Sequence, residues 1–167
     1  NPTGVTLSLE EIDNLCKKYK YVILDQAYML PDEPIHNLNH KNLILIRSFS
    51  KMGLITGLRF GFGMCFDNKL FLKFNQIRPM YLNSLTLKFI EYIVLNNITY
   101  KIKNKIDDEI IKFEYNIKDS IVSRAGNFVL FNNTIDTYND RQLKQYNFNN
   151  KLFYRLTIYE TDENKLC

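Results

Sequence analysis

The segment SFSKMGLITGLRFGFG, residues 48–63, places one lysine among serines, with an arginine further along. Lys51 directly follows Ser50, and Ser48 and Arg59 lie on its two sides in the sequence. A lysine amine attacks carbonyl carbons once burial or neighbouring cations lower its pKa. A guanidinium can grip two oxygens of a phosphate, and hydroxyl groups can satisfy the others. The pattern therefore predicts an amine nucleophile beside a phosphate site, although these residues taken alone also fit a solvated loop.

A reactive lysine beside a phosphate site favours pyridoxal phosphate as the cofactor. The pyridine nitrogen of that cofactor needs a carboxylate partner, and its phenolic oxygen needs hydrogen-bond donors. Asp25 ends the apolar run YVILD and is the candidate carboxylate, while Tyr28 and the amide of Asn1 are candidate donors. Each has a plainer interpretation: Asp25 can cap a turn, Tyr28 can be a packing residue, and Asn1 can be a turn residue.

Short apolar runs predict the strands that position these groups. The runs YVILD and NLILIRS end at Asp25 and Ser48 and are typical of buried parallel strands. Folds of the α/β class place their chemistry at the carboxyl ends of such strands. LRFGFGMCF is a third predicted strand, in which Gly61 and Gly63 indicate close approach of another backbone.

Helical patterns alternate with these runs. SLEEIDNLCKKY has a capping box, Ser8 and Glu11, and its apolar residues fall on one face. KLFLKFNQI, NSLTLKFIEYIVLNN (capped by Asn83 or Ser84) and an amphipathic stretch at 99–116 also read as helices. GNFVLF and KLFYRLTIY read as strands, and Asp162 is expected to start a last helix. The first ~75 residues thus alternate strand with helix, and the remainder mixes helices with a few strands, so an α/β fold with two subdomains is expected.

Composition argues against several classes of protein. The 22 basic and 18 acidic residues are interspersed, which favours a solvated surface over a nucleic-acid interface. The apolar runs are too short to span a bilayer, and no signal peptide opens the chain, so a cytoplasmic protein is expected. His36 and His40 have a spacing that can chelate a metal, but they follow prolines in a loop-like stretch, so no metal site is predicted. The cysteines form no CxxC pair and are Cys16, Cys65 and Cys167.

Several motifs together resemble one family. NPTG, VILDQAY, RSFSK followed by Arg59, and YRLTIYETDEN occur in the order seen in fold-type I pyridoxal-phosphate aminotransferases. The similarity is greatest to the histidinol-phosphate aminotransferase branch, in HKNLILIRSFSK, RPMYLNSLT and SRAGNFVLF, the last likened to a strand around Asn127. It runs from Asn1 to about Asn164. It implies that residues 1–78 form the second half of a three-layer αβα cofactor domain, and that 79–167 form a connecting helix and a small α+β domain.

The resemblance also implies roles for single residues. Lys51 would hold pyridoxal phosphate and shuttle a proton between the substrate Cα and the cofactor C4′. Asp25 would pair with the pyridinium, and Asn1 and Tyr28 would bond the phenolic oxygen. The phosphate would be held by Ser48, Ser50 and Arg59.

Arg155 would bind the α-carboxylate of the substrate in the same resemblance. It lies in the apolar run LFYRLTI, where an unpaired charge would be costly if buried. Without the resemblance, an exposed strand face is the alternative.

Some positions depart from the family pattern. Gln26 stands where a glutamate is usual, Tyr159 where a glycine is usual, and Gly53-Leu54 replaces an aromatic–glycine pair. These residues are not reacting groups, so they bear on substrate choice. The chain also begins at Asn1 and not at Met, and family members begin well upstream, so it is expected to be a piece of a longer protein.

The expected function is that of a pyridoxal-phosphate-dependent aminotransferase. Its donor would be a phosphorylated or polar amine such as histidinol phosphate, and 2-oxoglutarate would be the acceptor. A homodimer is expected for the full-length protein, and the isolated fragment is expected to be inactive. Two alternatives stay open: a phosphoamino-acid decarboxylase of the same fold, and a truncated non-catalytic relative that acts as an interaction module.

Overall fold

The computed structural model describes residues 4, 6–31, 40–51, 57, 59–77, 82–117, 121–132 and 143–157. The chain divides into two compact units, one of residues 7–100 and one that combines residues 1–6 with 101–167. The boundary that the sequence suggests between residues 78 and 79 stays a prediction.

The first unit opens with α1 (Leu9–Lys18), whose start is fixed by its capping residues. The Ser8 hydroxyl accepts from the Glu11 amide at 3.2 Å, and the Glu11 carboxylate accepts from the Ser8 amide at 2.7 Å. The bond from the Ser8 backbone lowers the pKa of Glu11, since it stabilises the ionised form. The predicted capping box is therefore confirmed.

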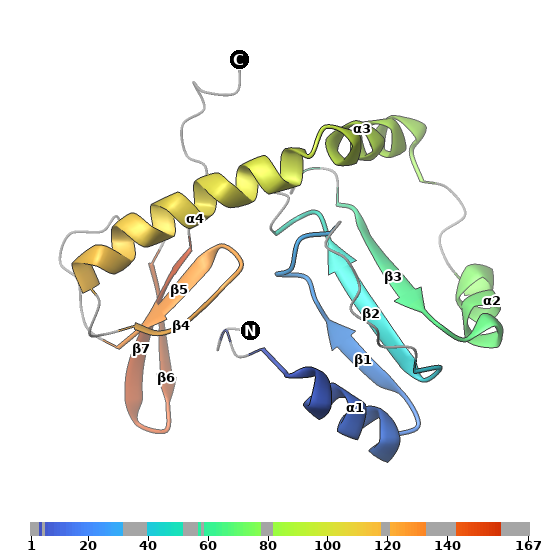
Figure 1. Ribbon diagram of the computed structural model, residues 1–167, viewed down its shortest axis with the longest axis horizontal. Helices are drawn as coiled ribbons and strands as arrows, with labels where there is room; N and C mark the ends of the chain where they lie inside the picture. Colours follow the sequence, from blue (N-terminus) through green and yellow to red (C-terminus); the bar gives the residue numbers. More distant parts are fainter. Residues whose placement is uncertain are drawn as a thin grey trace. The chain divides into compact units, whose positions relative to one another are not determined.

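Three strands form the sheet of this unit, in the order β1-β2-β3. They are β1 (Val22–Asp25), β2 (Leu43–Ser48) and β3 (Gly61–Cys65). β1 and β2 run parallel, with Asp25 opposite Ile46, and β3 returns antiparallel to β2 (Figure 1). The three predicted strands are confirmed, with boundaries a few residues shorter than the sequence runs.

The two faces of the sheet differ in cover. Ile12 and Cys16 of α1 pack with Val22, Leu43 and Leu45 as one buried cluster, so α1 covers that face. Side chains alternate between the faces of a strand, so Ile23 and Ile46 lie on the other face. They are 64% and 42% exposed. Among the described residues, this second face is apolar and is open at Ile23 and Ile46, whereas Ile44 on the same face is only 8% exposed.

Two further helices belong to this unit, α2 (Asn68–Ile77) and α3 (Ser84–Leu95). Asn83 caps α3, since its side chain accepts from the Leu85 amide at 2.8 Å. Ile90 and Ile93 of α3 form a buried cluster with Phe49, the residue just after β2. This cluster anchors the end of β2 to α3.

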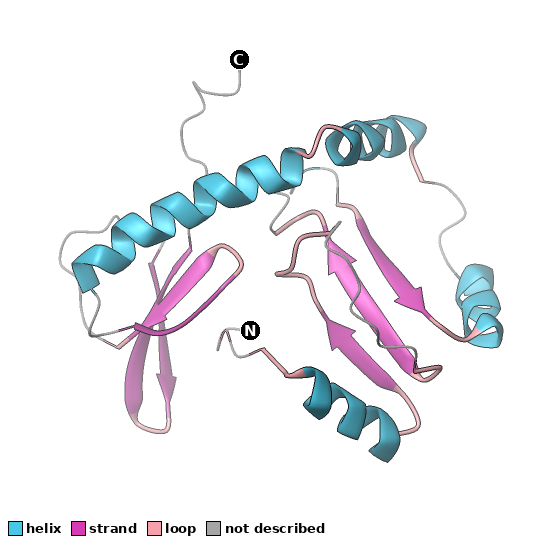
Figure 2. Ribbon diagram, viewed as in Figure 1, coloured by secondary structure: helices cyan, strands magenta, loops and turns pink. Residues whose placement is uncertain are grey.

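The second unit is a four-stranded antiparallel sheet with one long helix (Figure 2). The helix is α4 (Ile98–Ile117), which begins in the first unit. The strands are β4 (Ile121–Ala125), β5 (Phe128–Phe131), β6 (Leu143–Phe148) and β7 (Lys151–Thr157), in the order β4-β5-β7-β6. The rings of Phe113 on α4 and Phe131 on β5 lie 5.5 Å apart, so α4 packs on this sheet.

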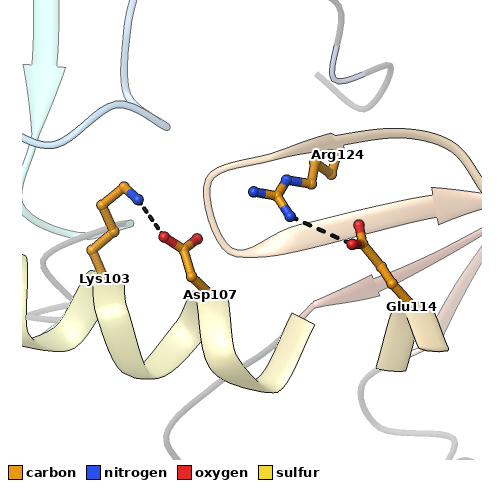
Figure 3. A network of polar contacts seen from close by, with 4 residues as sticks. All are labelled: Lys103, Asp107, Glu114 and Arg124. Atoms are coloured by element: carbon orange, nitrogen blue, oxygen red, sulfur yellow. Dashed lines mark hydrogen bonds and ion pairs between the residues drawn. The ribbon is translucent and has the colours of Figure 1, made fainter. Parts of the chain in front are cut away.

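Ion pairs accompany this packing (Figure 3). Arg124 of β4 reaches Glu114 of α4, with Nη1 and Oε2 3.5 Å apart. Lys103 and Asp107 pair one turn apart on α4 itself. Arg124 is about half exposed, so its pair adds only ~0.2–1 kcal/mol and the apolar packing dominates.

One strand, β6, was not predicted from the sequence, and another, β4, differs from the prediction. β6 (LKQYNF) is interrupted by Lys144, Gln145 and Asn147 and is largely exposed, so it lacks the apolar run that predicts a strand. The segment SRAGNFVLF, likened to one strand around Asn127, instead holds the end of β4, a turn at 126–127 and the strand β5. Asn127 therefore lies in a turn and not within a strand, which corrects that expectation. No helix among the described residues is long and apolar enough to cross a membrane.

The close approach expected at the glycines of β3 is found at Gly61 but not at Gly63. A Cβ on Gly61 would lie 2.9 Å from the Arg47 carbonyl oxygen, whereas one on Gly63 would lie 3.8 Å from that of Leu45. The first contact is a backbone clash, and the second is ordinary van der Waals contact.

We therefore expect Gly61→Ala to lower the free energy of unfolding by ~1–3 kcal/mol, because the β2–β3 pair must shift to admit the methyl group. Gly63→Ala is the matched control in the same strand and should be neutral or slightly stabilising. Denaturant unfolding of the two variants measures the difference. Equal stabilities would contradict the close packing of Gly61 on β2.

Candidate functional site

The predicted cofactor residues gather at one edge of the β1-β2-β3 sheet. Because β1 and β2 are parallel, their last residues, Asp25 and Ser48, end at the same edge. β3 starts there, with Gly61 opposite Ser48. Arg59 lies just before Gly61, and the Phe49 amide extends the pairing by donating to the Phe60 carbonyl at 3.1 Å. The strand directions thus bring a carboxylate, a hydroxyl and a guanidinium to one edge.

A tight turn after β2 presents the serines and the lysine. The Ser48 hydroxyl oxygen accepts from the Ser50 amide at 3.0 Å. Its hydroxyl proton remains available to donate, because a hydroxyl both donates and accepts. Lys51 follows at once and is exposed. This turn can therefore offer hydroxyl donors to an anion next to an accessible amine.

Arg59 has an unusual backbone conformation. Its φ is +48°, in the left-handed region that non-glycine residues seldom adopt. Such a conformation costs about 1–2 kcal/mol and persists where the surroundings impose it, commonly at functional sites. Arg59 is exposed, and it supplies the guanidinium at the sheet edge.

The turn after β1 carries the other candidates. The Asp25 carboxylate accepts from the Ala27 amide at 2.9 Å, which orients the carboxylate and starts a turn. Tyr28 lies in that turn, and the Lys51 Nζ lies 5.4 Å from the centroid of its ring. A cation at that distance from an aromatic face is attracted to it. The turns that follow β1 and β2 are thus in contact through Tyr28 and Lys51, two residues that the sequence analysis predicts to bind the same cofactor.

A large hollow adjoins this edge within the first unit. Its volume is about 1200 Å³, and it extends over the open sheet face toward α2 and α3. At the sheet edge, the hollow is lined by the polar residues Ser48, Ser50 and Arg59. Elsewhere its lining is mostly apolar and includes Ile23, Ile46 and Phe74. Ile23 and Ile46 are well exposed, so most of this hollow is an uncovered apolar sheet face with a polar end. That polar end is the part suited to an anion.

Arg155 belongs to the second unit and has a different setting. It lies on β7, only 7% exposed, so the alternative of an exposed strand face does not hold. Its Cζ is 4.9 Å from the centroid of the Phe128 ring and 5.9 Å from that of Tyr146. β5 and β6 pair with β7 on its two sides, so the aromatic rings come from both neighbouring strands. Such rings hold the guanidinium in one orientation.

Some predicted features fall outside the described residues. They include Asn1, His36, Gly53, Leu54, Tyr159 and the helix expected from Asp162. Among the residues that the structure describes, no group of three metal-ligating side chains is found.

Sequence reasoning missed one residue near the site, Arg47 on β2. It is 2% exposed, and its Nε donates to the Gln26 side-chain oxygen at 3.1 Å. Its only sequence signal is a charge inside the apolar run LILIRS, directly before Ser48. A charged residue in a buried strand needs partners, and here they lie in the turn after β1.

Comparison with known proteins gives consistent results. The sequence model of the family described as "Aminotransferase class I and II" matches residues 1–135. A histidinol-phosphate aminotransferase 2 of Archaeoglobus fulgidus is 40% identical over 39% of this chain and 20% of its own length. A histidinol-phosphate aminotransferase of Thermotoga neapolitana is 29% identical over 99% of this chain and 53% of its own length.

Solved structures agree on the fold. The histidinol-phosphate aminotransferase of Sinorhizobium meliloti, solved in complex with pyridoxal-5′-phosphate, matches with a TM-score of 0.72 at 20% identity. That match covers 96% of this chain and 51% of the other, so the chain spans about half the length of such relatives. The family match over most of the sequence, together with this fold, shows that the chain belongs to the class I and II aminotransferases.

Proposed function

We propose that the complete protein is a pyridoxal-phosphate-dependent aminotransferase and that Lys51 holds the cofactor. The observation that carries the proposal is the convergence at one sheet edge of an amine, two serine hydroxyls, a guanidinium and a carboxylate. Membership of the aminotransferase family and the names of the relatives support it.

The described residues fit this cofactor chemically. The cofactor carries a phosphate, a pyridine nitrogen and a carbonyl carbon, and the sheet edge offers a partner for each. Ser48, Ser50 and Arg59 would bind the phosphate, because they line the polar end of one hollow. Asp25, oriented by the Ala27 amide, would hold the proton on the pyridine nitrogen. Once bound, pyridoxal phosphate supplies an electron sink for bonds to the substrate Cα.

Lys51 would also act as the proton carrier. Its Nζ would carry the proton between the substrate Cα and the cofactor C4′. Its position directly after the Ser48–Ser50 turn and against the Tyr28 ring keeps the amine at the sheet edge. Tyr28 and Asn1 would donate to the phenolic oxygen, a role carried by the family resemblance.

Arg155 would bind the anionic group of the substrate. Its guanidinium is fixed against Phe128 and Tyr146, so little freedom is lost on binding an anion. The donor that we propose, histidinol phosphate, carries a phosphate ester and no carboxylate, and glutamate carries a carboxylate. One guanidinium can grip either anion. 2-Oxoglutarate as acceptor and a homodimeric assembly complete the proposal on the strength of the resemblance.

The assignment of Lys51 is tested by chemical trapping. Borohydride treatment of the complete protein with pyridoxal phosphate should leave a phosphopyridoxyl group on the peptide that contains Lys51, read by mass spectrometry. Lys51→Ala should lose the label, whereas Lys41→Ala, which removes a lysine just before β2, should keep it. Labelling of another lysine in the Lys51→Ala protein would refute the assignment.

The role of Arg155 is tested by half-reactions. Arg155→Met keeps the apolar stem against Phe128 but removes the charged donors. Loss of a bidentate charged contact of ~2–4 kcal/mol corresponds to a roughly thirty- to thousand-fold fall in kcat/KM toward glutamate and histidinol phosphate. Pyridoxal-phosphate affinity should stay unchanged, because the phosphate is held at Ser48, Ser50 and Arg59.

Arg124→Met serves as the control in the same sheet and should leave both half-reactions intact. A loss confined to glutamate would show that the phosphorylated donor is held elsewhere or is not the natural substrate. Unchanged rates with both substrates would mean that Arg155 has no part in binding them. Carbon dioxide release from a phosphoamino acid would favour the decarboxylase alternative.

A further inference from the structure

We infer that Arg47 is a positioning residue of the cofactor site, which holds the turn after β1 against the end of β2. The inference rests on the proposed function, since the turn carries Tyr28 and begins at Asp25. Family resemblance assigned no role to Arg47; the inference comes from its burial and its hydrogen bonds.

Arg47 links three segments from a buried position. Its Nε donates to the Gln26 Oε1 at 3.1 Å, and its Nη1 donates to the Pro31 carbonyl at 3.3 Å. These two acceptors lie at the two ends of the turn that follows β1. A guanidinium presents its donors in a rigid planar fork, so the two bonds fix the separation of those ends. A buried arginine therefore clamps the turn.

The same turn is tied to β2 through its backbone. The Gln26 amide donates to the Ile46 carbonyl at 2.8 Å, and the Met29 amide donates to the Gln26 carbonyl at 3.0 Å. Gln26 is thus bound to β2 by its backbone at Ile46 and by its side chain at Arg47. Because Asp25 precedes Gln26 and Tyr28 lies inside the turn, the clamp sets the positions of both.

The Arg47 side chain leaves β2 on the face opposite to that of Ser48. Side chains alternate along a strand, so Arg47 shares a face with Leu43 and Leu45, which α1 covers. Ile46 and Ser48 lie on the other face, and Ser48 lines the hollow at its polar end. Arg47 also borders the hollow, but its guanidinium donates to Gln26 and Pro31, so its part in the site is to hold the turn after β1.

The test compares Arg47→Met with Arg124→Met in the complete protein. Methionine keeps the apolar stem and removes the fork, whereas Arg124 is a partly exposed arginine outside the site. Hydrogen bonds to charged donors are strong, so we expect Arg47→Met to weaken pyridoxal-phosphate binding roughly ten-fold or more. The circular dichroism band of the bound cofactor should also change in shape. Arg124→Met should change neither.

Amide hydrogen exchange without cofactor gives an independent readout. The amides of Gln26 and Met29 should exchange roughly ten-fold faster in Arg47→Met, because the turn opens locally. Gln26→Leu removes one acceptor on a half-buried residue and should give a smaller change in the same direction. Gln26→Glu keeps an acceptor and should retain wild-type binding and exchange.

The outcomes separate the inference from the proposed function. A wild-type protein that does not bind pyridoxal phosphate refutes the proposed function, and the positioning role falls with it. The positioning role alone is overturned if the wild-type protein binds pyridoxal phosphate and both Arg47→Met and Gln26→Leu keep its affinity, circular dichroism and amide exchange. If Arg47→Met does not fold, Gln26→Leu decides: faster exchange and weaker binding support the role, and wild-type values overturn it.

Discussion

The parallel pairing of β1 with β2 is the constraint on which the rest of the site depends. Parallel strands end at the same edge of a sheet, so pairing Asp25 with Ile46 leaves Asp25 and Ser48 near one another although 22 residues of chain separate them. β3 runs antiparallel to β2 and begins opposite Ser48, so Arg59, which precedes β3, lies at the same edge. A slip of one residue in this register would move every side chain of the strand to the other face.

Packing around this pairing explains why the register holds. Leu43 and Leu45 are almost fully buried under α1, so β2 cannot turn its other face inward without exposing them. Gly61 allows β3 to approach the Arg47 carbonyl closely, and Arg47 in turn secures the turn after β1. Gly61 thus lets β3 pack closely against one side of β2, and Arg47 holds the turn after β1 at the other side of β2.

Much of this part of the fold can be predicted from the sequence. The capping box at Ser8 and the apolar runs ending at Asp25 and Ser48 are local signals, and the structure confirms the elements that they predict. β6 was missed because an exposed strand with polar residues has no apolar run. The clamp by Arg47 was missed because it depends on contacts between residues 26, 31 and 47, which no local pattern reveals. The roles of the site residues stay predictions.

A crystal structure of the complete protein with pyridoxal phosphate tests the central claim most directly. We expect continuous electron density from the Lys51 Nζ to the cofactor. We also expect phosphate oxygens within hydrogen-bond distance of Ser48, Ser50 and Arg59, with the pyridine nitrogen beside Asp25. A cofactor joined to another lysine, or a phosphate held away from the edge where β1 and β2 end, would contradict the claim.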